Sequence, residues 1–304
     1  MTETASGAWT AGLTPLNADL SIDIVAYLAH VRALLDGGCA GVAALGTTGE
    51  ANSFSLSERL ALIEALGEAG IPAHRIMIGV GCCAAPDTIA LARAALAAGY
   101  ANVLMLPPFY YKSVSEEGLF RAYAGVIEGI DDPRLRVFIY DFPQMTGVKI
   151  GLALLARLAE AFRGIVVGVK NSSGEWEAME AVLKQLPGFK VFAGSEQFLL
   201  PTLRAGGPGC ISATANVTHA TLADLVAHWR EADADACQGA VTRTRVMLQG
   251  YPTIPALKEI MAHASGRDAW RRVRPPLVNL GAEDAAALIG KARAAGVLEA
   301  LGAA

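Results

Sequence analysis

The chain has 304 residues, 53% of them hydrophobic and 18% charged, with a formal net charge of −4. A chain of this length buries a large apolar core without disulfides or metals, so these values indicate a packed globular enzyme. No concentrated block of lysine and arginine offers a face for nucleic acid, and no stretch approaches the roughly 20 apolar residues that span a bilayer. We therefore expect no nucleic-acid partner, no membrane partner and a cytoplasmic location.

Short apolar runs rich in β-branched residues recur along the chain, and each precedes a stretch with helical periodicity. Several runs are apolar at every position, which is what strands covered on both faces require. A spacing of about 25 to 35 residues suits a strand, a loop and a crossover helix. Eight strands are predicted, at residues 9–14, 41–45, 75–80, 102–106, 136–142, 165–170, 190–193 and 209–213.

The stretches between these strands carry helix start signals. Ser57-Glu58-Arg59 opens one helix, Pro86 and Asp87 start another at 87–97, and Ser115 opens a third. Eight strands, each followed by a helix, close into a (β/α)₈ TIM barrel of the α/β class. The competing architecture is an open doubly wound sheet, which usually carries a GxGxxG after its first strand, and no such motif follows Thr14.

The strand pattern stops at about Leu222, and the remaining sequence is helical in character, at 219–231, 235–249, 253–263 and 283–298. We expect residues 1–232 to form the catalytic barrel and residues 233–304 to form a C-terminal helical extension packed on it. The basic stretch Arg271-Arg272-Val273-Arg274 within the extension is interpreted as a solvated helix end or a subunit contact.

Barrel enzymes carry their chemistry at the carboxyl ends of the strands, so the polar residues at those ends are the candidates. After the second predicted strand comes Gly46-Thr47-Thr48-Gly49-Glu50, where glycines and hydroxyls make a turn able to hold a small carboxylate. The alternative is a polar turn that only caps the next helix. Tyr110 and Tyr111 follow the fourth strand in a proline-stiffened loop, which is either a shaped pocket, an oligomer contact or surface packing.

The fifth and sixth predicted strands end in the two most informative side chains. Tyr140 places a phenol, which both donates and accepts protons, at the barrel mouth, unless it is a buried structural tyrosine. Lys170 ends an apolar strand aimed at the active-site face, although lysine is rarely buried. Burial frees its amine to attack a carbonyl, whereas the alternatives are a lysine that reaches solvent or pairs with Glu50 or Asp141.

No metal or cofactor motif competes with this lysine. The histidines lack ligand spacing to cysteine or carboxylate clusters, and the sequence has neither a GxSxG elbow nor a P-loop. The five cysteines show no disulfide framework. We therefore expect organic, cofactor-free chemistry without a metal.

Together these segments resemble the dihydrodipicolinate synthase / N-acetylneuraminate lyase family of class I pyruvate-dependent aldolases. Gly46–Glu50 matches the family's GTTGE loop, residues 140–147 resemble its YNxPxxTG segment, and residues 168–174 resemble its GxKxxxG lysine segment. The similarity spans essentially the whole chain. Further matches are Pro108-Phe109-Tyr110-Tyr111, Glu117-Gly118-Leu119, Ala193-Gly194-Ser195, Gly209-Cys210-Ile211-Ser212 and Arg274-Pro275-Pro276-Leu277.

The resemblance implies a role for each strand-end residue. Lys170 forms a Schiff base with pyruvate or another 2-keto acid, and Tyr140 moves protons during imine formation and C–C bond making or breaking. Thr47 and Tyr111 complete a proton relay, with Tyr111 reaching across from a neighbouring subunit of a homotetramer or homodimer. The substrate-binding residues that it implies are Thr47 and Thr48 for the carboxylate and Gly194 and Ile211 through their carbonyls.

One position departs from the family pattern and bears on the second substrate, an aldehyde. Dihydrodipicolinate synthases carry an arginine before the TG of the tyrosine segment, where it grips the carboxylate of aspartate semialdehyde, and here that residue is Met145. A thioether cannot make this bidentate contact. We therefore favour a 2-keto-3-deoxy sugar acid aldolase, with Ser195 as a contact to substrate hydroxyls or alternatively a helix cap. The other candidates are 4-hydroxy-tetrahydrodipicolinate synthase, a keto-deoxy sugar acid dehydratase and a non-catalytic keto-acid-binding barrel.

Overall fold

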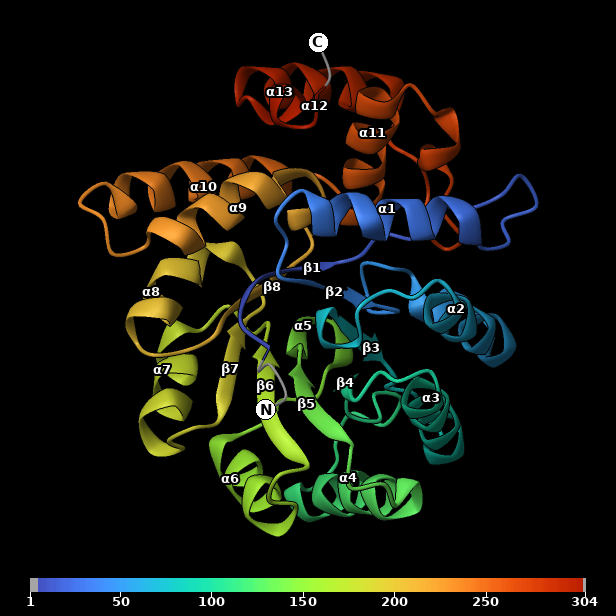
Figure 1. Cartoon of the computed structure of the whole chain (residues 1–304), viewed down its shortest axis with the longest axis vertical. Coiled ribbons are helices and arrows are strands. Elements are labelled where there is room, and N and C mark those ends of the chain that lie inside the picture. The colour runs from blue at the N-terminus through green and yellow to red at the C-terminus, as the bar shows by residue number, and fades with distance from the viewer. Residues whose placement is uncertain (1–4, 303–304) are drawn as a thin grey trace.

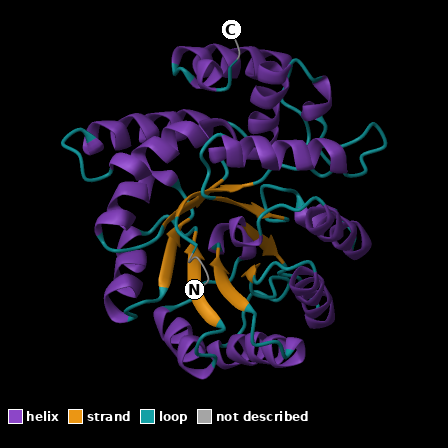
Figure 2. Ribbon diagram, viewed as in Figure 1, coloured by secondary structure: helices purple, strands orange, loops and turns teal. Residues whose placement is uncertain are grey.

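A computed structural model describes residues 5–302. Residues 1–4 of the expected barrel and residues 303–304 of the expected extension lie outside the described residues. Eight parallel strands form a closed barrel in chain order, with β8 pairing to β1. Helices surround this barrel on its outside (Figures 1 and 2). The predicted (β/α)₈ fold is confirmed.

The eight strands are short, and most of them lie within a residue or two of the predicted runs. They are β1 (Gly7–Ala11), β2 (Gly41–Ala44), β3 (Ile76–Gly79), β4 (Asn102–Met105), β5 (Arg136–Asp141), β6 (Val166–Asn171), β7 (Lys190–Ala193) and β8 (Gly209–Ser212). The first strand was predicted too late, at 9–14. The last residues of the predicted run bond outside the sheet: the Leu13 N–H donates to Asn216 Oδ1, and the Thr14 hydroxyl donates to the Gly49 carbonyl.

Thirteen helices and four short 3₁₀ segments follow or connect the strands within the described residues. The helices are α1 (Ile24–Asp36), α2 (Leu56–Glu68), α3 (Ala85–Ala97), α4 (Glu116–Ile130), α5 (Pro143–Thr146), α6 (Leu152–Ala161), α7 (Trp176–Gln185), α8 (Leu199–Arg204), α9 (Ala215–His228), α10 (Ala234–Gln249), α11 (Thr253–Ser265), α12 (Ala282–Ala294) and α13 (Val297–Ala300). The 3₁₀ segments are η1 (Ala51–Ser53), η2 (Ala73–Arg75), η3 (Glu196–Phe198) and η4 (Asp268–Arg271).

Local signals explain where several helices begin and end. Ser55, rather than the predicted Ser57, caps α2 in a reciprocal capping box with Glu58, and Ser115 caps α4 as predicted. The helix predicted at 283–298 is divided in two, because Gly296 adopts a left-handed φ of 72° between α12 and α13.

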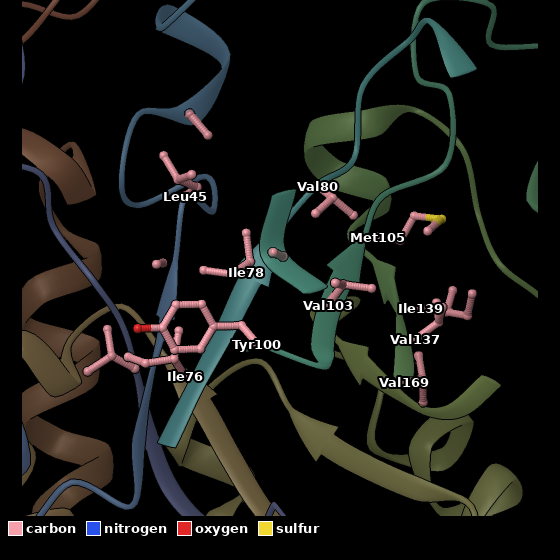
Figure 3. Close-up of a cluster of buried hydrophobic side chains, with 14 of the residues drawn as sticks. Leu45, Ile76, Ile78, Val80, Tyr100, Val103, Met105, Val137, Ile139 and Val169 are labelled. Atoms are coloured by element: carbon pink, nitrogen blue, oxygen red, sulfur yellow. The ribbon is translucent and has the colours of Figure 1, made fainter. Parts of the chain in front are cut away.

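Alternation along the strands gives the barrel two separate cores. One set of side chains fills the barrel interior: Trp9, Ala11, Ala43, Met77, Leu104, Phe138, Tyr140, Phe192 and Ile211. The alternate set packs against the surrounding helices, and Figure 3 shows part of it, including Ile76, Ile78, Val103, Met105, Val137, Ile139 and Val169. Because Val169 faces outward, the next residue, Lys170, faces the barrel interior.

A helical C-terminal region is present, as predicted, and it shares a core of its own with the barrel. Leu13 after β1 and Val217 of α9 are buried together with Leu257, Ile260 and Trp270. Helices α11 to α13 lie together beyond α1 and α10 in Figure 1. The division at residue 232 stays a prediction. Among the described residues, no helix is long and apolar enough to cross a membrane.

The basic stretch at 271–274 bonds within the chain, so its interpretation as a solvated helix end was wrong, while the alternative of a subunit contact stays a prediction. The Arg272 guanidinium donates to the Leu16 carbonyl, at 3.0 Å. Arg274 donates to the Leu20 and Ser53 carbonyls and pairs with Glu58 of α2. These arginines attach the C-terminal region to the loops at the mouth of the barrel.

Candidate active site

Lys170 and Tyr140 are brought together by the pairing of β5 with β6. The register places Tyr140 opposite Lys170 and Asp141 opposite Asn171. Both side chains are 4% exposed, and the Lys170 ammonium lies 4.3 Å from the centre of the Tyr140 ring. The Lys170 nitrogen therefore lies over the ring of a phenol at the carboxyl end of the barrel.

Lys170 has no carboxylate partner in the described part of the chain. The two acids considered as alternatives are occupied elsewhere, since Glu50 pairs with Lys258 and Asp141 accepts from the Ile150 N–H and the Asn171 side chain. The alternatives of a lysine that reaches solvent or pairs with these acids were therefore wrong. A buried amine without an acid partner is free to react with a carbonyl carbon.

Thr47 and Thr48 lie in a tight turn after β2 rather than in a helix cap. The Glu50 N–H donates to the Thr47 carbonyl, and the Ala51 N–H donates to the Gly46 carbonyl. Among residues 5–302, the N–H groups of Thr47 and Thr48 have no hydrogen-bond acceptor. Thr47 lines a small pocket together with Tyr140. Free backbone donors beside a hydroxyl suit a bound carboxylate.

Gly194, Ser195 and Ile211 lie at the ends of β7 and β8. The Gly194 N–H donates to the Asn171 carbonyl, and a side chain at residue 194 would overlap Ser172, which explains the glycine. Ile211 is fully buried inside the barrel. The Ser195 hydroxyl accepts the Gln197 N–H and caps η3, which is the alternative role considered for it.

A buried acidic network beside these residues was not singled out from the sequence as a cluster. Glu196 is 1% exposed, accepts hydrogen bonds from Ser212 and Thr214, and lies 3.6 Å from Arg245 of α10. This carboxylate is therefore engaged within the chain. Its partner Arg245 lies 49 residues away in the sequence, so no local motif could have identified the pair.

The structure does not bring Tyr111 or Met145 into the pocket that Thr47 and Tyr140 line. Tyr111 is 73% exposed and packs edge-on against Tyr110, with the ring centres 5.3 Å apart. Met145 is 60% exposed on the short helix α5, which follows Phe142, a residue stacked on Tyr140. Both residues are open to contact from outside the single chain.

No group of three His, Cys, Asp or Glu residues able to hold a metal occurs among the residues that the structure describes. The site consists of an amine, a phenol, hydroxyls and backbone donors. An amine and a phenol are groups that can form an imine with a carbonyl compound and move its protons.

Asp141 occupies the position of the asparagine in the family's YNxPxxTG segment. It is 2% exposed, its Oδ1 accepts the Ile150 N–H at 3.2 Å, and its Oδ2 accepts from Asn171 at 3.1 Å. Burial is the largest cause that raises the pKa of this carboxyl from 3.8 to about 6. Asp141 is thus a structural anchor between β5, β6 and the segment before α6.

Known proteins of one family are similar to this chain over most of its length. A model of the dihydrodipicolinate synthetase family matches residues 4–294. A relative from Chloroflexus aurantiacus, named an uncharacterized DapA-like lyase, is 34% identical over 289 residues, covering 93% of this chain and 94% of the relative. A 4-hydroxy-tetrahydrodipicolinate synthase from Chlorobium limicola is 31% identical over 245 residues, covering 80% of this chain and 81% of the relative.

Solved structures show the same similarity. Dihydrodipicolinate synthase from Agrobacterium tumefaciens has a TM-score of 0.88 at 35% identity, covering 95% of this chain and 98% of that chain. The E. coli prophage protein YagE, solved in complex with pyruvate, has a TM-score of 0.88 at 27% identity, covering 96% and 99%.

Replacing Asp141 by asparagine should flatten the pH dependence of stability. Well below pH 3.8 the carboxyl is protonated in the folded and unfolded states, so the contribution of Asp141 to stability is fully present. That contribution is lost as the pH rises through the folded value of about 6. We expect the unfolding free energy of the wild type to fall, relative to Asp141→Asn, by about 2 kcal/mol between pH 4 and 7.

Urea unfolding at several pH values and one protein concentration measures this difference. Glu180→Gln is the control, because Glu180 forms an exposed i,i+4 pair with Lys184 on α7. A difference in unfolding free energy between wild type and Asp141→Asn that stays constant with pH would contradict the raised pKa of the buried Asp141 carboxyl.

Proposed function

Because the chain belongs to the dihydrodipicolinate synthetase family of pyruvate-dependent lyases, we propose that it is a reversible aldolase releasing pyruvate from a 2-keto-3-deoxy acid. The observation that carries this proposal is the buried, acid-free Lys170 amine 4.3 Å from the Tyr140 ring. The pyruvate complex of YagE supports the choice of the keto acid.

The proposed reaction begins with attack of the Lys170 amine on the keto carbon of the substrate, and water leaves as the imine forms. The protonated imine is an electron sink, so the bond between the third and fourth carbons breaks and its electron pair forms an enamine. Tyr140 accepts the proton of the hydroxyl on the fourth carbon. This carbon and its oxygen become the carbonyl group of the departing aldehyde. Protonation of the enamine and hydrolysis of the imine then release pyruvate and restore Lys170.

The surrounding residues bind and orient the keto acid in this proposal. Thr48 and the free N–H groups of the turn hold the carboxylate, and the carbonyls of Gly194 and Ile211 lie around the rest of the bound substrate. Thr47 passes protons between Tyr140 and the Tyr111 of a neighbouring subunit in a homodimer or homotetramer. The 73% exposure of Tyr111 supports such a shared relay, since the single chain leaves this phenol without a place in the pocket.

Met145 decides the preference for the second substrate. Its neutral, exposed side chain on α5 offers no bidentate contact to a second carboxylate, which favours a polyhydroxylated aldehyde partner, with Ser195 proposed as a hydroxyl contact. The Chlorobium limicola relative, a 4-hydroxy-tetrahydrodipicolinate synthase, supports condensation with aspartate semialdehyde as the second candidate. A dehydratase acting on keto-deoxy sugar acids would use the same imine.

Borohydride reduction in the presence of pyruvate should attach one pyruvate-derived group to Lys170, detected by intact mass and peptide mapping. Lys170→Met should lose this adduct and at least about 1,000-fold of the aldolase turnover, because it removes the nucleophile. Lys190→Met is the matched control, since Lys190 begins β7 at the opposite end of the barrel. A wild-type enzyme that forms no adduct is a keto-acid-binding barrel or uses other chemistry.

Met145→Arg should raise kcat/KM for aspartate semialdehyde with pyruvate by about 10- to 100-fold, because a charged hydrogen bond contributes about 1.5–3 kcal/mol. Gln144→Arg adds the same charge one residue earlier on α5 and should change this value little. The unaltered enzyme should cleave 2-keto-3-deoxy sugar acids faster than it condenses aspartate semialdehyde. Strong turnover of the semialdehyde by the unaltered enzyme would show that the substrate assignment is wrong.

A further inference from the structure

Glu50, the last residue of the Thr47–Glu50 turn, is held by two groups from the C-terminal region. Its side chain is buried, and one carboxylate oxygen accepts from the Lys258 ammonium of α11. The other oxygen accepts the Arg274 backbone N–H at 2.8 Å. Lys258 is itself 0% exposed and also donates to the Arg272 carbonyl at 2.6 Å.

The backbone of this turn is bracketed by two non-glycine residues in the left-handed region. Leu45 has a φ of 55° and Glu50 a φ of 59°. Such a conformation costs an L-residue roughly 1–2 kcal/mol and persists only where the surrounding structure holds it. The Glu50 side chain supplies that restraint at the C-terminal end of the turn, next to Thr47 and Thr48.

On the other side, the turn is fixed by the first strand and its loop. The Thr14 hydroxyl donates to the Gly49 carbonyl at 2.8 Å, and Gly49 packs so closely on the Gly12 carbonyl that a Cβ would lie 2.9 Å from it. The Arg274 guanidinium adds a bond to Ser53, three residues after Glu50. The turn is thus clamped between the barrel and residues more than 200 positions later in the chain.

We infer that Lys258 and the Arg274 backbone position Thr47 and Thr48 for the substrate carboxylate by fixing Glu50. This inference rests on the proposed function, because it takes the turn as the carboxylate site. Lys258 is a positioning residue, since its ammonium bonds to Glu50 and to the Arg272 carbonyl and acts on the turn through Glu50. The C-terminal extension thereby becomes a part of the substrate site rather than a cover for the barrel alone.

The test uses paired neutral variants, because Lys258→Met alone leaves an unpaired buried carboxylate and endangers folding. Glu50→Gln/Lys258→Met removes both charges together. The half-saturating pyruvate concentration for borohydride trapping on Lys170 should rise about 10- to 100-fold in this variant, because a small displacement of a binding group has such an effect. The trapping rate at saturating pyruvate should change much less.

Glu50→Gln alone, which keeps a carbonyl acceptor for Lys258, should shift the half-saturating concentration in the same direction by a smaller factor. Arg271→Met is the control for a purely structural effect. It breaks the pairs of Arg271 with Glu259 and Asp268 in the same extension, so it should lower thermal stability and leave pyruvate dependence unchanged.

The inference is overturned, and the proposed function is left standing, if folded Glu50 variants keep the half-saturating pyruvate concentration of the wild type. An equal shift of this concentration in Arg271→Met has the same consequence. A wild-type enzyme that traps no pyruvate overturns the proposed function, and the inference falls with it. The two failures are therefore separated by the wild-type measurement in the same experiment.

Discussion

Strands β5 and β6 pair so that Tyr140 lies opposite Lys170, and the site depends on this register. The side-chain period of a strand is two, so a slip of one residue would turn Lys170 toward the helices and Val169 into the barrel. The register is held by Asp141, which joins Asn171 of β6 and the Ile150 N–H in one buried contact. Closure of the barrel then places the Thr47–Glu50 turn and the ends of β7 and β8 at the same rim of the barrel as Lys170.

The sequence predicted the barrel because its signals are local and repeated. Apolar runs at a regular spacing, helix starts at Pro86 and Ser115, and the absence of a phosphate motif after Thr14 all favoured one architecture. Lys170 became the candidate because a lysine at the end of an apolar strand is unusual, and the family resemblance carried by its companion motifs then implied its chemistry. Element ends were less well predicted. Gly296 divides one predicted helix, and β1 ends early where Leu13 and Thr14 bond to other segments.

What the sequence could not show is which charged residue pairs with which. Glu50 and Asp141 were both possible partners of Lys170, and the structure assigns them to Lys258 and to Asn171 and Ile150 instead. The basic stretch that contains Arg274 was interpreted as a solvated helix end or a subunit contact. The partners of Arg274 are Leu20, Ser53 and Glu58, more than 200 residues earlier. Such pairs are fixed by the packing of the C-terminal region on the barrel mouth, and no periodicity or spacing encodes them.

In the proposed reaction one buried amine, set by strand register beside a phenol, forms the covalent link to the keto acid. A crystal structure of the enzyme soaked with pyruvate tests this claim most directly. We predict continuous density from the Lys170 Nζ to the second carbon of pyruvate, with the carboxylate at Thr47 and Thr48 and the Tyr140 hydroxyl beside the imine. Pyruvate bound without a covalent link, or joined to another lysine, would contradict the account.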